Sequence, residues 1–240
     1  MNRLLILPCA VILLAGCSTN PEKRVPRAAA DAMTGSPWTL TAVASLTMEG
    51  SGVVRGPDLE HPVTVTSFKR VLNFKKRQWL GDMTVLSPVA ERISMGLIGG
   101  HAFQRILEGA EIHGLDPQLK SELLRHPVGF LQAAFSGALP LSGTRNVEGM
   151  DAADLRVDGM VYTLFLDSVT KLPAKISATQ HFSTGDNVTE TAFPAYTTIH
   201  GYKLPSRIVT KVGPIVIEDL KIEQQVASAD AVELTIPDRL

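Results

Sequence analysis

The sequence predicts a mainly β domain of the α+β class, in which one curved antiparallel sheet carries a few helices on its concave side. Three observations lead to this prediction. Many segments are rich in Val and Thr and alternate in polarity, and Gly, Pro, Asn or Asp residues join them. A single helical block interrupts the series, and no strand-helix alternation indicates a parallel sheet. With 240 residues, 45% of them apolar, the chain is long enough to bury a full core.

The first sixteen residues have the pattern of a secretory signal peptide. Met1 to Arg3 is a short positive start, and Leu4 to Ala15 is an apolar run. Twelve residues are too few to cross a bilayer, which takes about 20 in a helix. A short apolar stretch followed by small residues is instead typical of a cleaved signal. We expect residues 1–16 to be removed, which also removes Cys9 and leaves the mature chain with one cysteine.

The tetrapeptide Leu14-Ala15-Gly16-Cys17 resembles the lipobox of bacterial lipoproteins. The resemblance implies that Cys17 is acylated, with palmitate among its chains, and becomes the new amino terminus. Several acyl chains on one residue give stable membrane anchoring. Ser18 takes the place of the Asp that favours retention in the inner membrane. We therefore expect an anchored protein on the periplasmic face of the outer membrane. The alternative is an ordinary signal peptide cut near a buried Cys.

Residues 17–37 are predicted to form a lipidated tether with a short helix. Ser18 to Arg27 has two prolines, four charges and one apolar residue, which is the composition of a spacer. Ala28 to Thr34 can form two helical turns closed by Gly35 and stopped by Pro37. The remaining chain, 38–240, is expected to be one β-rich domain.

Strand patterns fill the first part of that domain. Trp38 to Leu86 contains three alternating runs, TLTAVASLTMEGSGVV, PVTVTSFKRVLNF and QWLGDMTVL, which we interpret as antiparallel strands. The runs ERISMGLI and HAFQRIL follow, and Gly99-Gly100 joins them at the spacing of a hairpin.

The helical block extends from about Pro117 to Ser136. Asp116 is a suitable N-cap, and Pro117 suits the first helical position. Pro127 should divide the block into two short helices. Apolar residues four positions apart give each half an apolar stripe: Leu119 with Leu123, and Leu131 with Phe135.

After Gly137 the strand pattern returns seven times. The runs are RNVEG, DLRV, VYTLFLD, PAKISATQHF, NVTETAFPAY, KLPSRIVTK and PIVIEDLKIEQ. The total of eleven or twelve strands, with a helical hairpin inserted near the middle, predicts a curved sheet covered by the helices and enclosing an apolar interior.

The chain carries no recognisable catalytic, metal or nucleotide motif. Its 23 basic and 24 acidic residues give no excess of positive charge for nucleic acid. The six histidines show no metal-binding spacing, and HExxH, HxHxDH, GxSxG and GxxxxGK[ST] are absent. Asp151, Asp154 and Asp158 lack the spacing of a calcium loop. We predict no enzyme activity, no metal and no cofactor.

Gly50, Gly52 and Gly56 form a GxGxxxG pattern that is one residue too long for a dinucleotide fingerprint. The pattern lies between strand-like runs, with no helix to bind a pyrophosphate. We interpret these glycines as a bulge or a point of close backbone approach within the sheet.

Two stretches, Glu148 to Ile176 and Thr189 to Val209, carry turn-and-strand motifs. The chain resembles the LolA/LolB-like lipoprotein-carrier superfamily in these motifs. The first is Asp167, Thr170, Leu172, Pro173 and Lys175, and the second is Tyr196, Gly201, Leu204, Pro205 and Ile208. Ser45 to Val54 is also similar to the start of a LolA-like module that precedes some metallo-β-lactamase-fold hydrolases, although no hydrolase half is present here.

This resemblance implies an open half-barrel that holds an apolar ligand, either a lipid or a lipidated molecule, beneath a helical lid. The residues expected to line it are Leu123, Leu131, Phe135, Leu164, Leu166, Ile176 and Ile208. The alternatives are that these residues form a dry core, or that the domain is a non-catalytic module docking an envelope enzyme or assembly protein. The lipid anchor matches LolB more than LolA. The protruding apolar loop and lid-locking arginine of those carriers could not be located in the sequence.

Overall fold

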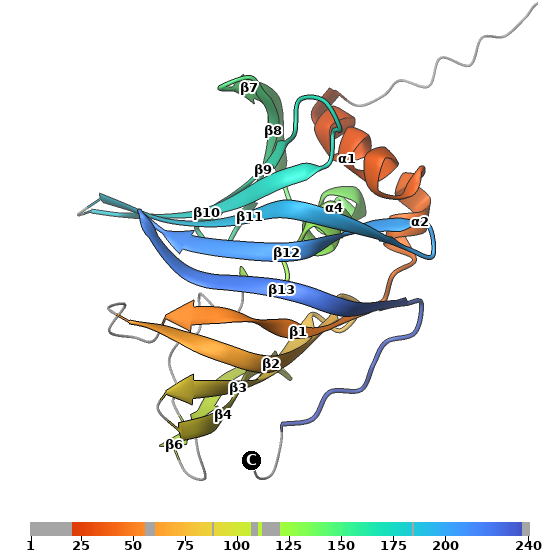
Figure 1. Cartoon of the computed structure of the whole chain (residues 1–240). Helices are drawn as coiled ribbons and strands as arrows, with labels where there is room; N and C mark the ends of the chain where they lie inside the picture. Colours follow the sequence, from red (N-terminus) through yellow and green to blue (C-terminus); the bar gives the residue numbers. More distant parts are fainter. Residues whose placement is uncertain are drawn as a thin grey trace, which may run out of the picture.

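The computed structural model describes residues 21–55, 61–87, 89–106, 110–111, 121–183 and 185–236. Signal residues 1–16, Cys17 and the first tether residues lie outside these ranges. Within them, all strands belong to one antiparallel sheet of thirteen strands, in the order β6-β5-β4-β3-β2-β1-β13-β12-β11-β10-β9-β8-β7 (Figure 1). The strands at the two ends of this order, β6 and β7, do not pair with each other, so the sheet is curved but open.

The sheet consists of two meanders joined where the first strand pairs with the last. The β1 to β6 meander runs toward one edge, and the β7 to β13 meander returns from the other edge until β13 pairs with β1. The strands are β1 Ser45–Arg55, β2 Pro62–Asn73, β3 Gln78–Ser87, β4 Val89–Ile98, β5 His101–Ile106, β6 Ala110–Glu111, β7 Leu141–Val147, β8 Met150–Val157, β9 Met160–Leu166, β10 Pro173–Phe182, β11 Gly185–Ile199, β12 Tyr202–Val212 and β13 Ile215–Ser228. Each of the seven strands predicted after Gly137 is confirmed.

The helices gather on the same side of the sheet (Figure 1). They are the 3₁₀ turn η1 Pro21–Lys23, followed by α1 Arg24–Thr34, α2 Pro37–Thr41 and α4 Pro127–Ser136. Because the chain between the two meanders includes α4, this helix lies in the segment that connects the two ends of the sheet. Among the described residues, no helix is long and apolar enough to cross a membrane.

Two boundaries at the start of the domain differ from the prediction. Helix α1 begins at Arg24, inside the predicted spacer, because its buried stripe extends back to Val25. The stripe also includes Ala29, Ala30 and Met33, and Gly35 ends the helix at a φ of 73° as expected. The first predicted strand was placed too early, since Pro37–Thr41 is helical and β1 starts only at Ser45. Leu40 is fully buried there, which a helical turn achieves as well as a strand.

Helix α4 confirms the second half of the predicted helical block. Pro127 is its first residue, and the Nδ1 atom of His126 caps it by accepting a hydrogen bond from the backbone N–H of Val128 at 3.3 Å. Gly137 ends the helix in the left-handed conformation. Ahead of the helix, residues 122–125 form turns. Asp116, Pro117 and Leu119 lie outside the described residues.

Glycines behave as predicted at two places in the first meander. Gly99 and Gly100 have φ values of 61° and 83° in the turn between β4 and β5, the conformation that such hairpins require. The pairing of β1 shifts register around Gly50. A Cβ atom on Gly50 would lie 2.0 Å from the carbonyl oxygen of Lys221, and one on Gly52 would lie 2.2 Å from that of Asp219. Close approach of β13 therefore requires glycine at both positions.

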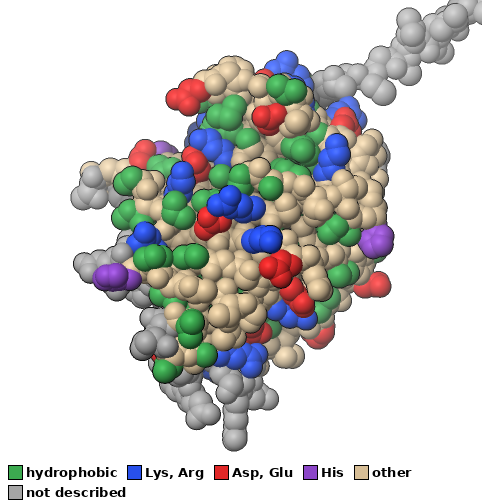
Figure 2. All heavy atoms as spheres, in the orientation of Figure 1, with side chains coloured by type: hydrophobic (Ala, Val, Ile, Leu, Met, Phe, Trp, Pro, Cys, Tyr) green, Lys and Arg blue, Asp and Glu red, His purple; other side chains and the backbone are tan. Residues whose placement is uncertain are grey.

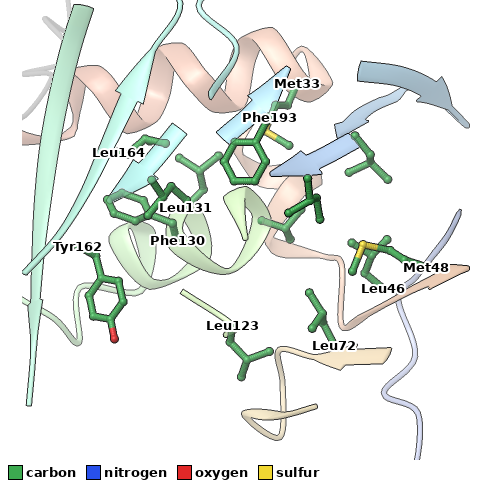
Figure 3. Packing of buried hydrophobic residues seen from close by; sticks show 14 of the residues in the cluster. Met33, Leu46, Met48, Leu72, Leu123, Phe130, Leu131, Tyr162, Leu164 and Phe193 are labelled. Carbon is green, nitrogen blue, oxygen red and sulfur yellow. The ribbon is translucent and has the colours of Figure 1, made fainter. Parts of the chain in front are cut away.

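The core lies between the concave face of the sheet and the helices. Figure 3 shows Phe130 and Leu131 of α4 beside Leu164 and Phe193 of the second meander. Met33, from α1, joins the same cluster. Both meanders thus pack on one continuous apolar layer. The outer face of the sheet is mixed in character, with Lys, Arg, Asp and Glu spread among apolar groups (Figure 2).

Candidate functional site

The seven residues predicted to line a ligand site all reach the interior. Leu131, Leu164, Leu166 and Ile176 have no exposed surface, and Leu123, Ile208 and the partly buried Phe135 belong to the same cluster: the structure brings the set together. In this conformation the residues pack against one another and against the helices. This mutual packing is what the dry-core alternative predicts for these residues.

Charged side chains lie inside this apolar layer, between the sheet and the segment that precedes α4. Arg70 of β2 donates from Nη1 to Oε1 of Glu122 at 2.7 Å and from Nη2 to Oε1 of Glu218, on β13, at 2.6 Å. Arg125 also donates to Glu122, and Thr210 Oγ1 donates to Glu218 at 3.0 Å. We call Arg70, Glu122, Arg125, His126 and Glu218 the Arg70 cluster. It joins the sheet to the lid segment, defined here as residues 121–136.

Burial and ion pairing act in opposite directions on the charges of the cluster. Burial lowers the pKa of Arg70, but Glu218 and Glu122 raise it, and the net direction is upward. Burial raises the pKa of Glu122, but Arg70 and Arg125 together lower it by more than that. The net direction is downward, so the Glu122 carboxylate stays ionised. Burial dominates at His126 and lowers its pKa to about 3, against the attraction of Glu122. The imidazole is therefore neutral at ordinary pH.

A cavity of about 10 Å³, the space of a single water molecule, adjoins the cluster. Apolar walls are formed by Met48, Leu72 and Ile208, and the charged residues of the cluster complete the lining together with Thr191 and Thr210. Three buried polar atoms of lining residues have no hydrogen-bond partner among the described residues: Nε2 of His126, Oγ1 of Thr191 and Nε of Arg125. Such atoms are rare in folded proteins. Of the seven predicted lining residues, only Ile208 borders this cavity.

The Arg70 cluster was not predicted from the sequence, although a signal for its buried charges is present in two strands. In β2, Arg70 alternates with Phe68 and Leu72, which face the core, so the pattern places a charge on the buried face. Glu218 precedes Leu220 and Ile222 with the same period in β13. Arg70 is therefore an arginine that links the sheet to the lid segment. No such arginine could be located from the sequence alone.

The motifs behind the family resemblance form turns and a tie between strands. Oδ1 of Asp167 accepts hydrogen bonds from the N–H groups of Val169 and Thr170 and from the Thr170 hydroxyl. Of these, the bond from the Thr170 backbone contributes most to a lowered pKa of Asp167. The hydroxyl of Tyr196, in the second motif, donates to the carbonyl oxygen of Pro173, in the first, at 2.6 Å. The motif residues thus hold the second meander together.

The acidic residues of β8 have structural partners. Asp151 accepts from Lys171 at 3.0 Å, and Asp154 accepts from Arg145 and Thr163. The hydrogen bond from Lys171 is the main cause of a lowered pKa at Asp151. Within the described ranges, no group of three His, Cys, Asp or Glu side chains is placed to hold a metal ion.

Comparisons with known proteins identify the fold. Neither a protein-family model nor a characterised protein sequence matches the chain. A LolA superfamily protein from Nitrosomonas europaea is similar in structure, with a TM-score of 0.50 at 12% identity over 91% of this chain and 96% of its own. A DUF1329 family protein from Desulfovibrio piger has a TM-score of 0.45 at 11% identity, over 87% of this chain and 94% of its own. A structure described as a putative outer membrane lipoprotein-sorting protein domain, from Vibrio parahaemolyticus, has a TM-score of 0.46 at 12% identity, over 79% of this chain and 88% of its own.

The fold defined by these strands and helices is therefore a LolA-like half-barrel, an open antiparallel sheet with helices in its concavity. The Nitrosomonas europaea protein supports this assignment, whereas the other two structures have TM-scores under 0.5. At 12% identity the similarity concerns the fold and not the ligand. The association with a module that precedes metallo-β-lactamase-fold hydrolases stays a prediction.

Proposed function

We propose that this protein is an outer-membrane lipoprotein, anchored on the periplasmic face through acylated Cys17, whose half-barrel takes up acyl chains of a lipid or lipidated molecule. Its role would lie in the handling of lipids or lipoproteins in the cell envelope, without catalysis. The observation that carries the proposal is the lid segment, a covering element that belongs to no strand of the sheet.

The lid segment can leave without breaking any pairing between strands. Its polar ties to the rest of the domain include the Arg70–Glu122 ion pair and two hydrogen bonds from Nε2 of Gln132, to the carbonyl oxygens of Leu40 at 3.0 Å and Val43 at 2.6 Å. Apolar packing by residues such as Phe130 and Leu131 adds to these polar ties. Apolar packing is non-directional, so acyl chains can replace these side chains against the sheet.

The cavity beside the Arg70 cluster, at about 10 Å³, is too small for an acyl chain, so uptake at this place requires the lid segment to move. Displacing the lid exposes apolar surface of the sheet at a cost of about 25 cal/mol per Å². A ligand with acyl chains offsets that cost by covering the same surface. Separation of Glu122 from Arg70 adds to this cost, because it leaves a buried charge without one of its partners.

The test is native mass spectrometry of the mature chain from which the anchor is removed by Cys17→Ser, purified from cell envelopes without detergent. We expect a stoichiometric lipid or lipidated molecule to accompany the protein and to be recovered by organic extraction. The unsubstituted protein should show the added mass of acyl chains at Cys17. An empty Cys17→Ser chain that also takes up no fluorescent fatty acid would refute the carrier function.

The packing of the predicted lining residues against one another favours a second candidate, a non-catalytic module that docks an envelope enzyme or assembly protein with nothing bound inside. Here the residues of the core serve stability alone, as in any close-packed domain. In the same experiment this candidate predicts an empty protein accompanied by a protein partner in fixed stoichiometry.

A further inference from the structure

We propose that the Arg70 cluster is a head-group subsite, which binds the oxyanion of an amphiphilic ligand while the acyl chain lies along the apolar interior. The inference rests on the proposed function and narrows its ligand to anionic amphiphiles, whose head is a carboxylate or a phosphate. In the closed structure the Glu122 carboxylate of the lid segment occupies the place that the ligand's oxyanion takes after exchange.

The sheet side of the cluster keeps Arg70 oriented when the lid moves. Glu218, on β13 of the same sheet, accepts a hydrogen bond from Nη2 of Arg70 and another from the Thr210 hydroxyl. Nη1 of Arg70 binds Glu122, which belongs to the lid segment. Displacement of that carboxylate leaves a buried guanidinium group, which cannot lose its charge, with donors directed at an empty position. A carboxylate or phosphate satisfies these donors with the geometry that Glu122 has now.

The Arg70 guanidinium has two anionic partners in the closed state, Glu122 of the lid segment and Glu218 of β13. When the lid segment moves, Glu122 and Arg125 leave together, and Arg70 keeps Glu218 as its anionic partner. A ligand oxyanion restores the second anionic partner of Arg70, which an uncharged head group does not.

The unpartnered atoms around the cavity are also suited to an oxyanion. Nδ1 of His126 accepts the backbone N–H of Val128, so the neutral ring carries its proton on Nε2. The three unpartnered groups, Nε2 of His126, the Thr191 hydroxyl and Nε of Arg125, can therefore all donate. Two of these donors, on His126 and Arg125, move with the lid segment, whereas the Thr191 hydroxyl on β11 stays on the sheet side of the cavity with Arg70. An unpartnered hydroxyl beside an arginine is complementary to the lone pairs of a carboxylate or phosphate, and not to an alkyl group.

The walls of the cavity connect the charged end to the apolar interior. Met48, Leu72 and Ile208 line it beside the charged residues, and all three belong to the buried cluster that the lid segment covers. A ligand whose head occupies the cavity can therefore continue as an alkyl chain across the concave face. The arrangement selects a molecule that is anionic at one end and apolar along its length.

The experiment compares a fluorescent polyene fatty acid with its methyl ester, which has the same chain and no charge, on the mature Cys17→Ser chain. We expect the acid to bind about tenfold more tightly than the ester, as one charge-assisted hydrogen-bonded pair provides. Arg70→Gln should abolish the difference and retain binding of the ester. The matched control is Lys69→Gln, which removes an exposed charge from the other face of the same strand and should keep the tenfold preference.

Each result decides the inference separately from the proposed function. Equal affinity for acid and ester in the unsubstituted site would overturn the head-group subsite and leave the carrier function intact, whereas binding of neither probe would remove both. If Arg70→Gln fails to fold, Glu122→Gln replaces it: removal of the competing carboxylate should raise the preference for the acid, and an unchanged preference would overturn the inference. Competition by a lysophospholipid with a terminal phosphate, set against competition by a fatty acid, distinguishes the two sources of the oxyanion.

Discussion

Arg70→Ala should lower the free energy of unfolding by about 3 to 5 kcal/mol, because it leaves Glu122 and Glu218 buried without their shared cation. Urea denaturation of the substituted and unsubstituted chains measures the difference. The loss should be largest near neutral pH. Since Arg70 lowers the pKa of Glu122 in the folded state, its contribution is present above the ordinary pKa of a glutamate and disappears as the pH falls through the folded value.

The matched control for Arg70 lies on the outer face of the sheet. Arg207 makes a two-point ion pair with Asp219, at 2.8 and 2.7 Å, but half of the Arg207 side chain is exposed. Arg207→Ala should therefore cost at most about 1 kcal/mol. If the two substitutions cost the same, Arg70 is not held in a low-dielectric interior and the description of the cluster is wrong.

Phe130→Ala should cost about 3 to 5 kcal/mol, the range for deleting a fully buried aromatic ring from a core. The ring comes from α4 and lies at the centre of the layer between the lid segment and the sheet (Figure 3). Thermal or urea unfolding gives the size of the loss. Because the substitution also weakens the attachment of the lid, we expect the affinity for an apolar fluorescent probe to rise at the same time.

Val226 supplies the comparison for Phe130. Its side chain is 62% exposed on β13, and Val226→Ala should change the free energy of unfolding by less than about 0.5 kcal/mol. A Phe130→Ala protein as stable as Val226→Ala would show that α4 does not pack on the sheet as described. A destabilised Phe130→Ala protein with unchanged probe affinity would count against the lid role of this helix.

Most of the fold could be predicted from local patterns. The strands of the second meander alternate in polarity and are joined by turns with glycine at positive φ, for example Gly159 and Gly201. The close approach predicted at Gly50 and Gly52 is confirmed by the position of β13. Periodicity was weaker at Pro37–Thr41, where a five-residue run with two threonines fits a strand as well as a helical turn, and the helical turn buries Leu40.

The candidate site was harder to predict because it depends on contacts between distant segments. Along the chain, Glu122 lies 52 residues after Arg70, and Glu218 lies 148 residues after it. Alternation could have placed Arg70 on the buried face, but no local pattern indicates which acidic residues meet it. The seven apolar residues were correctly placed in the interior, since burial follows from periodicity. Whether they contact a ligand depends on movement of the lid, which no pattern in the sequence reports.

The most direct test of the account measures the distance between lid and sheet with and without ligand. The mature Cys17→Ser chain has no cysteine, so spin labels can be placed at two exposed positions, Ala138→Cys just after α4 and Lys221→Cys on β13. Pulsed electron paramagnetic resonance then gives the distance distribution. We predict one narrow distribution for the empty protein and a shift to longer distances when the fatty acid is bound. A bound fatty acid with an unchanged distribution would contradict uptake beneath a movable lid.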